Sequence, residues 1–398
     1  MPTLLILVAA MTALVVSLVV MPVVMRWAAR NDYVDRPEDD RRVHETATPN
    51  VGGVGIAIGI VAGMTVLALG FFDPAWFNPM LLTALAGGGV MLLAGLYDDI
   101  HGLGFKRKFL VQIVIAYALL HAGFRFDVAG LPFVGESGYD QALYSIPLTM
   151  LWIVGVINAI NLIDGIDGLA GGIGAIAGGF MGALFLMTGQ LHLAGLAFAV
   201  CAASLGFLYY NFYPASIFMG DTGSLTLGYA LAVLPMAGTF HSEPFLAIAI
   251  PAVVLGVPIL DTTVTIVRRM LRRKAICGPD DQHIHHRLMR RSNPRSASLT
   301  LYGVAGWFGA AAILLQLSTA FWAYVILVGS ISITLGWVYT LGYFRLEPFL
   351  RARRLNRLRR KRLAAERDSE ASQGQSHPVS GDGASVETAK VESLLGNG

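Results

Sequence analysis

The sequence alternates long apolar segments with short polar ones. Each apolar segment is long enough for a helix to cross the roughly 30 Å hydrocarbon core of a bilayer. About eleven such segments are predicted, near residues 3–25, 51–71, 80–97, 107–124, 143–161, 169–188, 191–210, 222–240, 244–267, 299–318 and 320–343. The pattern therefore predicts an all-α polytopic integral membrane protein, and an odd number of spans places the two termini on opposite sides of the membrane.

The basic residues predict which side each loop faces. Lys and Arg are retained on the cytoplasmic side of short loops, and all but Arg125 of the 29 Lys and Arg residues fall in one set of loops and the C-terminal tail. We therefore place the N-terminus in the periplasm, and the C-terminus and the catalytic loops on the cytoplasmic face. The first apolar segment has no basic stretch before it and no small-residue cleavage site, so we interpret it as a retained span.

Composition supports a membrane protein and limits its partners. Hydrophobic residues make up 55% of the chain, charged residues only 14%, and the mean hydropathy is +0.61, whereas a soluble domain carries about 25% charged residues. The net charge of +3 follows from the bias toward cytoplasmic Lys and Arg, so no nucleic-acid partner is expected. Neither Cys201 in a span nor Cys277 in a cytoplasmic loop favours a disulfide.

The chain divides into a membrane domain and a tail. Residues 1–345 contain all the predicted spans. Residues 346–398 are first basic and then of low complexity, and they lack the apolar content for a core. We expect a mostly disordered cytoplasmic tail whose basic stretch lies on anionic lipid head groups.

Acidic residues occur where predicted spans meet the cytoplasmic face. Asp98 and Asp99 end the third span, and adjacent carboxylates repel each other unless they share a cation. A divalent metal, or a lipid head group countered by that metal, would relieve the repulsion. For an Asp-Asp pair taken alone, a solvated helix end is the simpler interpretation.

The segment around the fifth span has the most specific spacing. Polar side chains recur at every third position, at Asn158, Asn161, Asp164 and Asp167, so a helix places neighbours on one strip. Such groups suit metal coordination or hydrogen bonds to a uracil, a ribose or an amido sugar. Burying them only to hold a bundle together is costly in a membrane, so we favour the functional interpretation.

Two further loops carry candidate contacts with phosphate, sugar or base. Asp221 begins the eighth span near free backbone N–H groups that can face a phosphate, although N-capping by Asp221 or Thr222 is the alternative. Phe218 can stack on a base or can simply pack. The other candidates in these loops are Asn211, before the eighth span, and Arg42, His44, Thr48 and Asn50 in the first cytoplasmic loop.

The most basic cytoplasmic loop contains a histidine-rich group. Its members are His283, His285, His286 and Arg287. Such a group suits a metal or a phosphate. Because the oxygen ligands elsewhere suit Mg²⁺ better than imidazole does, we assign the group to phosphate or sugar contacts, with a zinc site as the alternative. Upstream, Pro251 and Pro258 predict a kink in the ninth span, and Asp261 near its end is interpreted as structural.

Together these segments resemble the polyprenyl-phosphate N-acetylhexosamine-1-phosphate transferase superfamily, glycosyltransferase family 4. The resemblance covers residues 1–345 and rests on four motifs that occur together. They are Asp98-Asp99, Asn161 through Asp167, Phe218-Met-Gly-Asp-Thr-Gly-Ser224 and His283-Ile-His-His-Arg287. The chain is most similar to the bacterial branch that uses UDP-GlcNAc and undecaprenyl phosphate, because the muramoyl-pentapeptide branch usually has an acidic residue after its histidines.

The resemblance implies transfer of N-acetylglucosamine 1-phosphate from UDP-GlcNAc to undecaprenyl phosphate in the bacterial inner membrane. The products are undecaprenyl-diphospho-GlcNAc and UMP, the first membrane step of a cell-envelope polysaccharide. Mg²⁺ is the implied cofactor, with Mn²⁺ as a substitute. The implied roles are catalysis by Asp98, Asp99 and Asp221, metal ligation by Asn161 and Asp221, nucleotide or sugar binding by Asp164, Asp167, Asn211, Phe218, His44, Thr48 and Asn50, and diphosphate or sugar contact by His283, His285, His286 and Arg287.

The sequence is also compatible with other functions. The same reaction with another UDP-N-acetylhexosamine, or with UDP-MurNAc-pentapeptide, is compatible with much of the pattern. A transporter is the alternative from a different class, but its polar groups should lie near the midplane of the membrane rather than at one edge. Relatives in the family can be dimeric, so a homodimer is also compatible with the sequence.

Overall fold

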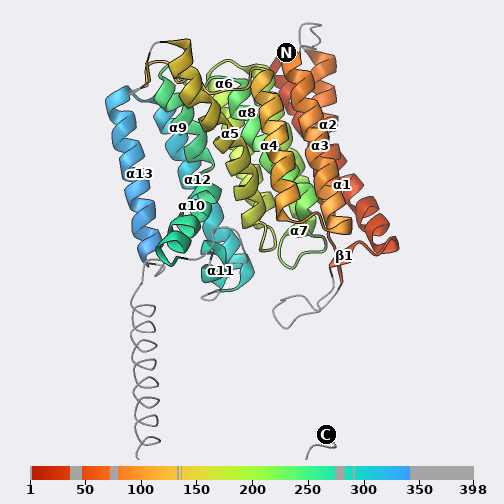
Figure 1. The fold of residues 1–398 in the computed structure, drawn as a ribbon. Coiled ribbons are helices and arrows are strands. Elements are labelled where there is room, and N and C mark those ends of the chain that lie inside the picture. The colour runs from red at the N-terminus through yellow and green to blue at the C-terminus, as the bar shows by residue number, and fades with distance from the viewer. Residues whose placement is uncertain are drawn as a thin grey trace, which may run out of the picture. The chain divides into compact units, whose positions relative to one another are not determined.

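The computed structural model describes residues 2–35, 47–71, 79–131, 134–135, 137–273, 283–289 and 292–340. These residues form helices and one small antiparallel sheet (Figure 1). The elements are α1 (Pro2–Arg30), β1 (Val34–Asp35), β2 (Thr48–Pro49), α2 (Gly53–Gly70), α3 (Pro79–His101), α4 (Phe105–His121), α5 (Gly138–Ile163), α6 (Leu169–Met187), α7 (Leu191–Asn211), α8 (Gly220–Ala237), α9 (Pro244–Val254), α10 (Gly256–Leu271), α11 (Ile284–Met289), α12 (Pro294–Leu317) and α13 (Ala320–Thr340). His44 and the predicted tail, 346–398, lie outside the described residues.

As far as the described residues extend, each predicted apolar segment contains a helix, but fewer helices qualify as membrane spans. Among the described residues, eight helices are long and apolar enough to cross a membrane, or nine when the bent pair α9 and α10 is one span. The predicted number of about eleven spans is therefore confirmed only in part, because eight or nine of them meet these criteria among the described residues. α4 is outside the set because it has only 17 residues. α8 is outside the set because polar residues, including Asp221 and Thr222, occupy its first turn.

The ninth predicted span is broken, as its prolines indicated. α9 and α10 meet at a bend of 87°, and the break at Leu255 falls between Pro251 and Pro258. Proline lacks a backbone N–H, and its ring clashes with the preceding turn of a helix. The bend lets α10 pack against α5 and α12.

The core lies around α6, α7 and α8. In the most apolar window of each helix, 72% of the α6 residues are buried, compared with 17% for α3 and 22% for α13. Glycines allow this packing: a Cβ at Gly178 would stand 2.9 Å from the backbone nitrogen of Cys201. Close approach of small residues is how helices associate in lipid, where the hydrophobic effect between helices is absent.

The loop segments that carry the candidate residues approach one another at one end of the bundle. β1 and β2 pair antiparallel, with Val34 opposite Pro49. At the end of β2, Pro49 O accepts the Phe218 N–H at 2.8 Å. At the start of α2, the Gly53 N–H donates to Met219 O at 3.0 Å. β1 and α11 lie at the same end of the described bundle in Figure 1. Which compartment this end faces remains a prediction.

Candidate active site

Three helices bring oppositely charged side chains together at this end. Asp98 lies in the last turn of α3, Asp221 in the first turn of α8 and Lys108 in the first turn of α4. The Lys108 Nζ atom lies 2.8 Å from Asp98 Oδ2 and also donates to Asp221 Oδ2. The Leu103 N–H donates to the second oxygen of Asp98. One ammonium group therefore links the two carboxylates.

Asp99 caps helix α8. Its Oδ1 atom accepts the Asp221 N–H at 2.8 Å, and its Oδ2 atom accepts the Thr222 N–H at 2.8 Å together with the Thr222 hydroxyl. The first N–H groups of a helix have no acceptor within the helix, and a carboxylate there is favoured by both hydrogen bonding and the helix dipole. The structure thus gives Asp99 the contacts of a residue that positions Asp221.

Asn161 of α5 completes the cluster. Its Nδ2 atom donates to Asp221 Oδ1 at 2.6 Å and to Ser224 Oγ at 2.8 Å. One turn earlier on the same strip, Asn158 donates to Gln112 of α4 and to Val154 O. Because a carboxamide carries both an acceptor oxygen and a donor NH₂, Asn161 can offer oxygen to a cation beside Asp221.

Glycines make this convergence sterically possible. A Cβ at Gly95 of α3 would stand 2.5 Å from Asp221 O, so the two helices approach closely only because the side chain is absent. Gly220 has φ +67°, and a Cβ there would stand 2.5 Å from Asp99 Oδ2. Glycine adopts such a backbone conformation without the steric cost that other residues incur. The first glycine of the Gly-Asp-Thr-Gly-Ser motif therefore allows the close approach of Asp99 to the start of α8.

Asp164, after the end of α5, lies within the electrostatic influence of the other carboxyl groups. Withdrawal from water raises the pKa of the Asp164 carboxyl to about 8, and the carboxylates of Asp221, Asp99 and Asp167 add to the rise. A like charge nearby disfavours ionisation. The raised pKa therefore shows that the carboxyl groups at this end of the bundle lie close enough to oppose one another's ionisation.

The chemistry of these donors fits a hard divalent cation. Carboxylate and amide oxygens such as those of Asp98, Asn161 and Asp221 are ligands that Mg²⁺ prefers, and a cation would relieve the repulsion between neighbouring carboxylates. Among the residues that the structure describes, no group of three or more His, Cys, Asp or Glu side chains is arranged to hold a metal. The two aspartates share Lys108 instead.

Asp167 and Asn211 hold the neighbouring loops together. Asp167 is 6% exposed and accepts the Ala215 N–H at 2.9 Å. Asn211 is 3% exposed, accepts the Gly168 N–H at 2.9 Å and donates to Ile217 O at 2.8 Å. These are positioning contacts with loop backbone, and the predicted nucleotide contacts of both residues remain predictions.

Residues 47–52, which precede α2, adjoin the cluster through their backbone. Phe218 is half-buried, and its carbonyl accepts the Gly52 N–H at 2.9 Å. Thr48 is buried in β2, and the Asn50 carbonyl lies so close to Gly220 that a Cβ there would stand 2.4 Å from it. Backbone contacts thus bring Asn50 and Phe218 to the start of α8, whereas Thr48 lies in the strand before them, opposite Asp35.

The histidine segment is attached to α10. His283 is 5% exposed, and its Nδ1 atom lies 3.0 Å from Oδ2 of Asp261, which is 2% exposed. Asp261 Oδ1 accepts the Ile284 N–H at 2.7 Å. The structural interpretation of Asp261 fits these contacts, and His283 lies within the protein rather than at its surface. His286 and Arg287 on α11 are partly exposed, and the side chain of His285 is outside the described set.

Sequence reasoning missed the specific role of Lys108. Lys106, Arg107 and Lys108 are consecutive cations, and only the register of α4 determines which of them faces the aspartates. Gln112 was also missed: it is 1% exposed, lies one turn beyond Lys108 and accepts a hydrogen bond from Asn158. A glutamine within an apolar helix was the available signal.

Comparison with known proteins places this geometry in context. Residues 81–239, which include Asp98, Asn161 and Asp221, match the family model described as "Glycosyl transferase family 4". A protein of Bacillus subtilis (strain 168) named "Probable undecaprenyl-phosphate N-acetylglucosaminyl 1-phosphate transferase" is 40% identical over 315 residues, which are 79% of this chain and 86% of that protein.

Two further relatives define the range of similarity. The decaprenyl-phosphate N-acetylglucosaminephosphotransferase of Mycobacterium tuberculosis is 30% identical over 312 residues, covering 70% of this chain and 74% of that protein. A phospho-N-acetylmuramoyl-pentapeptide-transferase of Desulforudis audaxviator is 33% identical over 287 residues, covering 66% of this chain and 83% of that protein.

Proposed function

This chain belongs to glycosyl transferase family 4, and we propose from that premise that it transfers N-acetylglucosamine 1-phosphate from UDP-GlcNAc to undecaprenyl phosphate. The products are undecaprenyl-diphospho-GlcNAc and UMP. The name of the Bacillus subtilis relative, which is similar over most of both chains, supports this acceptor and this sugar. The structural observation that carries the proposal is the convergence of Asp98, Lys108 and Asp221 at the end of an apolar bundle.

The reaction exchanges one phosphoanhydride for another. An oxygen of the lipid phosphate attacks the phosphorus that bears the sugar, and the bond from that phosphorus to the bridging oxygen breaks, so that UMP leaves with the bridging oxygen. Two anionic substrates must approach each other, and positive charge held in place lowers the cost of that approach. The lipid chain stays in the bilayer throughout.

Lys108 and Asp98 have the positions that this chemistry requires. The Lys108 ammonium, which lies between two carboxylates, can pair with phosphate oxygens when substrate binds. Asp98 is well placed to accept a proton from the lipid phosphate, because it lies at the end of a predicted span where a head group would enter. We favour direct attack by the lipid phosphate, and release of UMP in the absence of acceptor lipid would contradict it.

Mg²⁺ is the proposed cofactor. Asp221 and Asn161 would hold the ion, since their side chains already meet at 2.6 Å. When bound, the ion neutralises diphosphate charge and stabilises the UMP leaving group. Mn²⁺ offers the same ligand chemistry and is the expected substitute.

The surrounding loops are proposed to bind the donor. Asp164 and Phe218 would contact the nucleoside. Asp167 and Asn211 would hold the loops that carry these two residues in place, through their hydrogen bonds with Ala215 and Gly168. His286 and Arg287 on α11 are the described members of the histidine segment available to a sugar or diphosphate. We further propose that this end of the bundle faces the cytoplasm, where UDP-sugars are found.

The test is a transfer assay with purified protein in lipid nanodiscs. With labelled UDP-GlcNAc, undecaprenyl phosphate and Mg²⁺, label should move into the organic phase with one UMP released per labelled lipid, and EDTA should stop the transfer. Label from UDP-GalNAc or UDP-MurNAc-pentapeptide in place of UDP-GlcNAc would correct the donor. Failure of every donor would reject the transferase proposal.

A further inference from the structure

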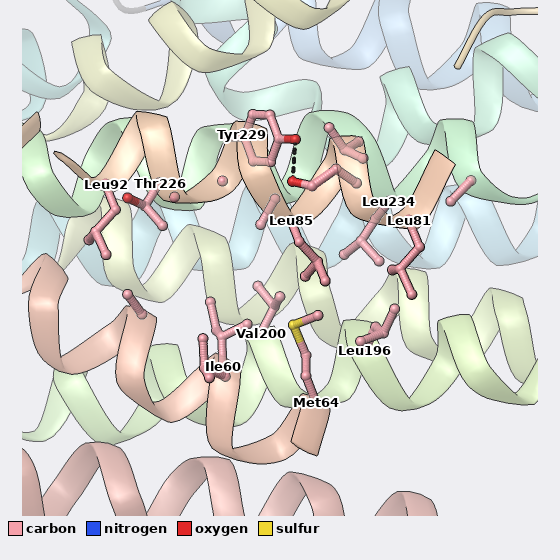
Figure 2. A pocket seen from close by; sticks show the side chains of 18 of the residues that line it. Ile60, Met64, Leu81, Leu85, Leu92, Leu196, Val200, Thr226, Tyr229 and Leu234 are labelled. Atoms are coloured by element: carbon pink, nitrogen blue, oxygen red, sulfur yellow. Dashed lines mark hydrogen bonds between the residues drawn. The ribbon is translucent and has the colours of Figure 1, made fainter. Parts of the chain in front are cut away.

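A groove separate from the charged cluster runs between α2 and α3, with α7 and α8 behind it (Figure 2). Its volume is about 480 Å³. The lining side chains come from four helices, with Phe124 added from the loop after α4, and they are almost all apolar. They include Ile60 and Met64 of α2, Leu85 and Leu92 of α3, Val200 of α7 and Leu234 of α8.

The polar groups in the lining are occupied within the protein. The Tyr229 hydroxyl donates to Ala84 O at 2.7 Å, the bond drawn in Figure 2. The Thr226 hydroxyl donates to Thr222 O at 2.6 Å. A polar ligand entering the groove would lose its hydration without finding partners, and that loss is costly. The groove therefore suits hydrocarbon.

The position of the groove indicates from which side an occupant enters. Along α3 it extends from Met80 to Leu92, about 18 Å at 1.5 Å per residue. That length is slightly more than half of the roughly 30 Å hydrocarbon core. Met80 lies in the first turn of α3, and Ala237 is the last residue of α8, so the groove begins at the end of the bundle remote from Asp98 and Asp221.

Backbone contacts close the groove before it reaches the charged cluster. A Cβ at Gly53 of α2 would stand 2.0 Å from Gly223 N of α8, and a Cβ at Gly95 of α3 would stand 2.5 Å from Asp221 O. Both walls are therefore in direct contact with α8 at this level. In addition, Asp98 pairs with Lys108 of α4, a helix that contributes nothing to the lining.

We propose that this groove binds one hydrocarbon chain of a bilayer phospholipid from the leaflet remote from the charged cluster, and that this lipid is distinct from the polyprenyl acceptor. α2 and α3 are candidate membrane spans, so lipid hydrocarbon is the surrounding medium. The two helices contact each other little and pack instead on α1, α7 and α8. A chain between them supplies the dispersion contacts that the walls do not make with each other.

A glycine in the lining allows the proposal to be tested. Gly89 lines the groove, and a Cβ there would meet no atom within 4 Å. Gly89→Leu should therefore fill the groove without moving a helix. Gly306 of α12 is the matched control, because a Cβ there is equally unhindered and Gly306 is not part of the lining.

The measurement is photolabelling in nanodiscs by a phospholipid with a diazirine on its acyl chain, mapped by peptide mass spectrometry. Labelling of α2 and α3 lining residues is scaled to labelling of the lipid-facing helix α13. The probe should label the groove of the wild type and of Gly306→Leu to the same extent. It should label the groove of Gly89→Leu about tenfold less, a loss of binding free energy of about 1.4 kcal/mol. Equal groove labelling in Gly89→Leu would overturn the proposal.

A competition on the wild-type protein distinguishes the lipid sources without any variant. Unlabelled phospholipid should reduce groove labelling in proportion to its amount, and undecaprenyl phosphate should displace no more label than an equal amount of phospholipid. Preferential displacement by undecaprenyl phosphate would identify the occupant as the acceptor and overturn the proposal. Absence of lipid adducts from the α2 and α3 lining residues of the wild-type protein would also overturn it, since no lipid chain would then occupy the groove.

Discussion

Asp98 and Asp99 are adjacent in sequence but bind different partners. Asp98 pairs with Lys108 at 2.8 Å, whereas Asp99 accepts the first N–H groups of α8. Sequence predicted that both aspartates belong to a functional centre, but it could not separate them. Which carboxylate faces which neighbour depends on the rotation of α3 and on its close approach to α8 at Gly95.

The capping role of Asp99 predicts a specific pattern of substitution. Asp99→Ala should lower the free energy of unfolding by about 1 kcal/mol, the usual cost of losing an N-cap, and it should reduce turnover by displacing Asp221. Asp99→Asn keeps one of the two acceptor oxygens, so it should retain part of the stability and part of the turnover. The checks are thermal unfolding and the kcat for UMP release. Equal loss of turnover in the two variants would show that the negative charge matters rather than the cap.

Lys108 is predicted to be essential for turnover. Lys108→Met should reduce the rate of transfer about 100-fold or more, because it removes the positive group that faces both aspartates. Lys106→Met, one of the adjacent cations and exposed, is the control and should retain near-normal rates. Similar rates for the two variants, measured as lipid-linked label per minute, would reject the role of Lys108.

Among the elements, the sequence predicted the long helices well and the short one not at all. The apolar segments and the proline break between α9 and α10 follow from local chemistry. α11 has only six residues, Ile284–Met289, and is held by a tertiary contact rather than by its own helix propensity. The contact of Asp261 with His283 and Ile284 joins segments more than twenty residues apart, which no local pattern reveals.

The attachment of α11 to α10 gives a prediction for this element. Asp261→Ala should lower kcat/KM for the donor by about 10- to 100-fold, because α11 would lose its anchor and misplace His286 and Arg287. Asp261→Asn retains an acceptor for the Ile284 N–H and should lose less. Thr263→Ala, an exposed position nearby, is the control. An unchanged kcat/KM in Asp261→Ala would exclude α11 from donor binding.

For the molecule as a whole, composition and the positions of Lys and Arg predicted a multi-pass helical protein, and the part of the chain that the structure describes confirms that class with eight or nine candidate spans. The convergence of Asp98, Asn161 and Asp221 was inferred from their shared predicted side. The distances between the paired side chains could not be predicted from the sequence, because they depend on how helices far apart in sequence pack.

Orientation in the membrane is predicted from the same charge bias. In a cysteine-free background, Lys106→Cys should react with a membrane-impermeant maleimide only in inside-out vesicles, and Asp127→Cys only in right-side-out vesicles or intact spheroplasts. Both positions are exposed in the structure. The reversed pattern would place the charged cluster outside the cell and contradict use of a cytoplasmic UDP-sugar.

The aspartates at one end of the bundle are proposed to perform the transfer. The most direct measurement compares the initial rate of GlcNAc 1-phosphate transfer for Asp221→Asn and Asp127→Asn, each in nanodiscs with equal amounts of folded protein. Asp127 is an exposed aspartate in the loop after α4, at the other end of that helix from Lys108. We predict that Asp221→Asn abolishes transfer while Asp127→Asn retains the wild-type rate. A near-normal rate for Asp221→Asn would show that Asp221 is not required for the transfer.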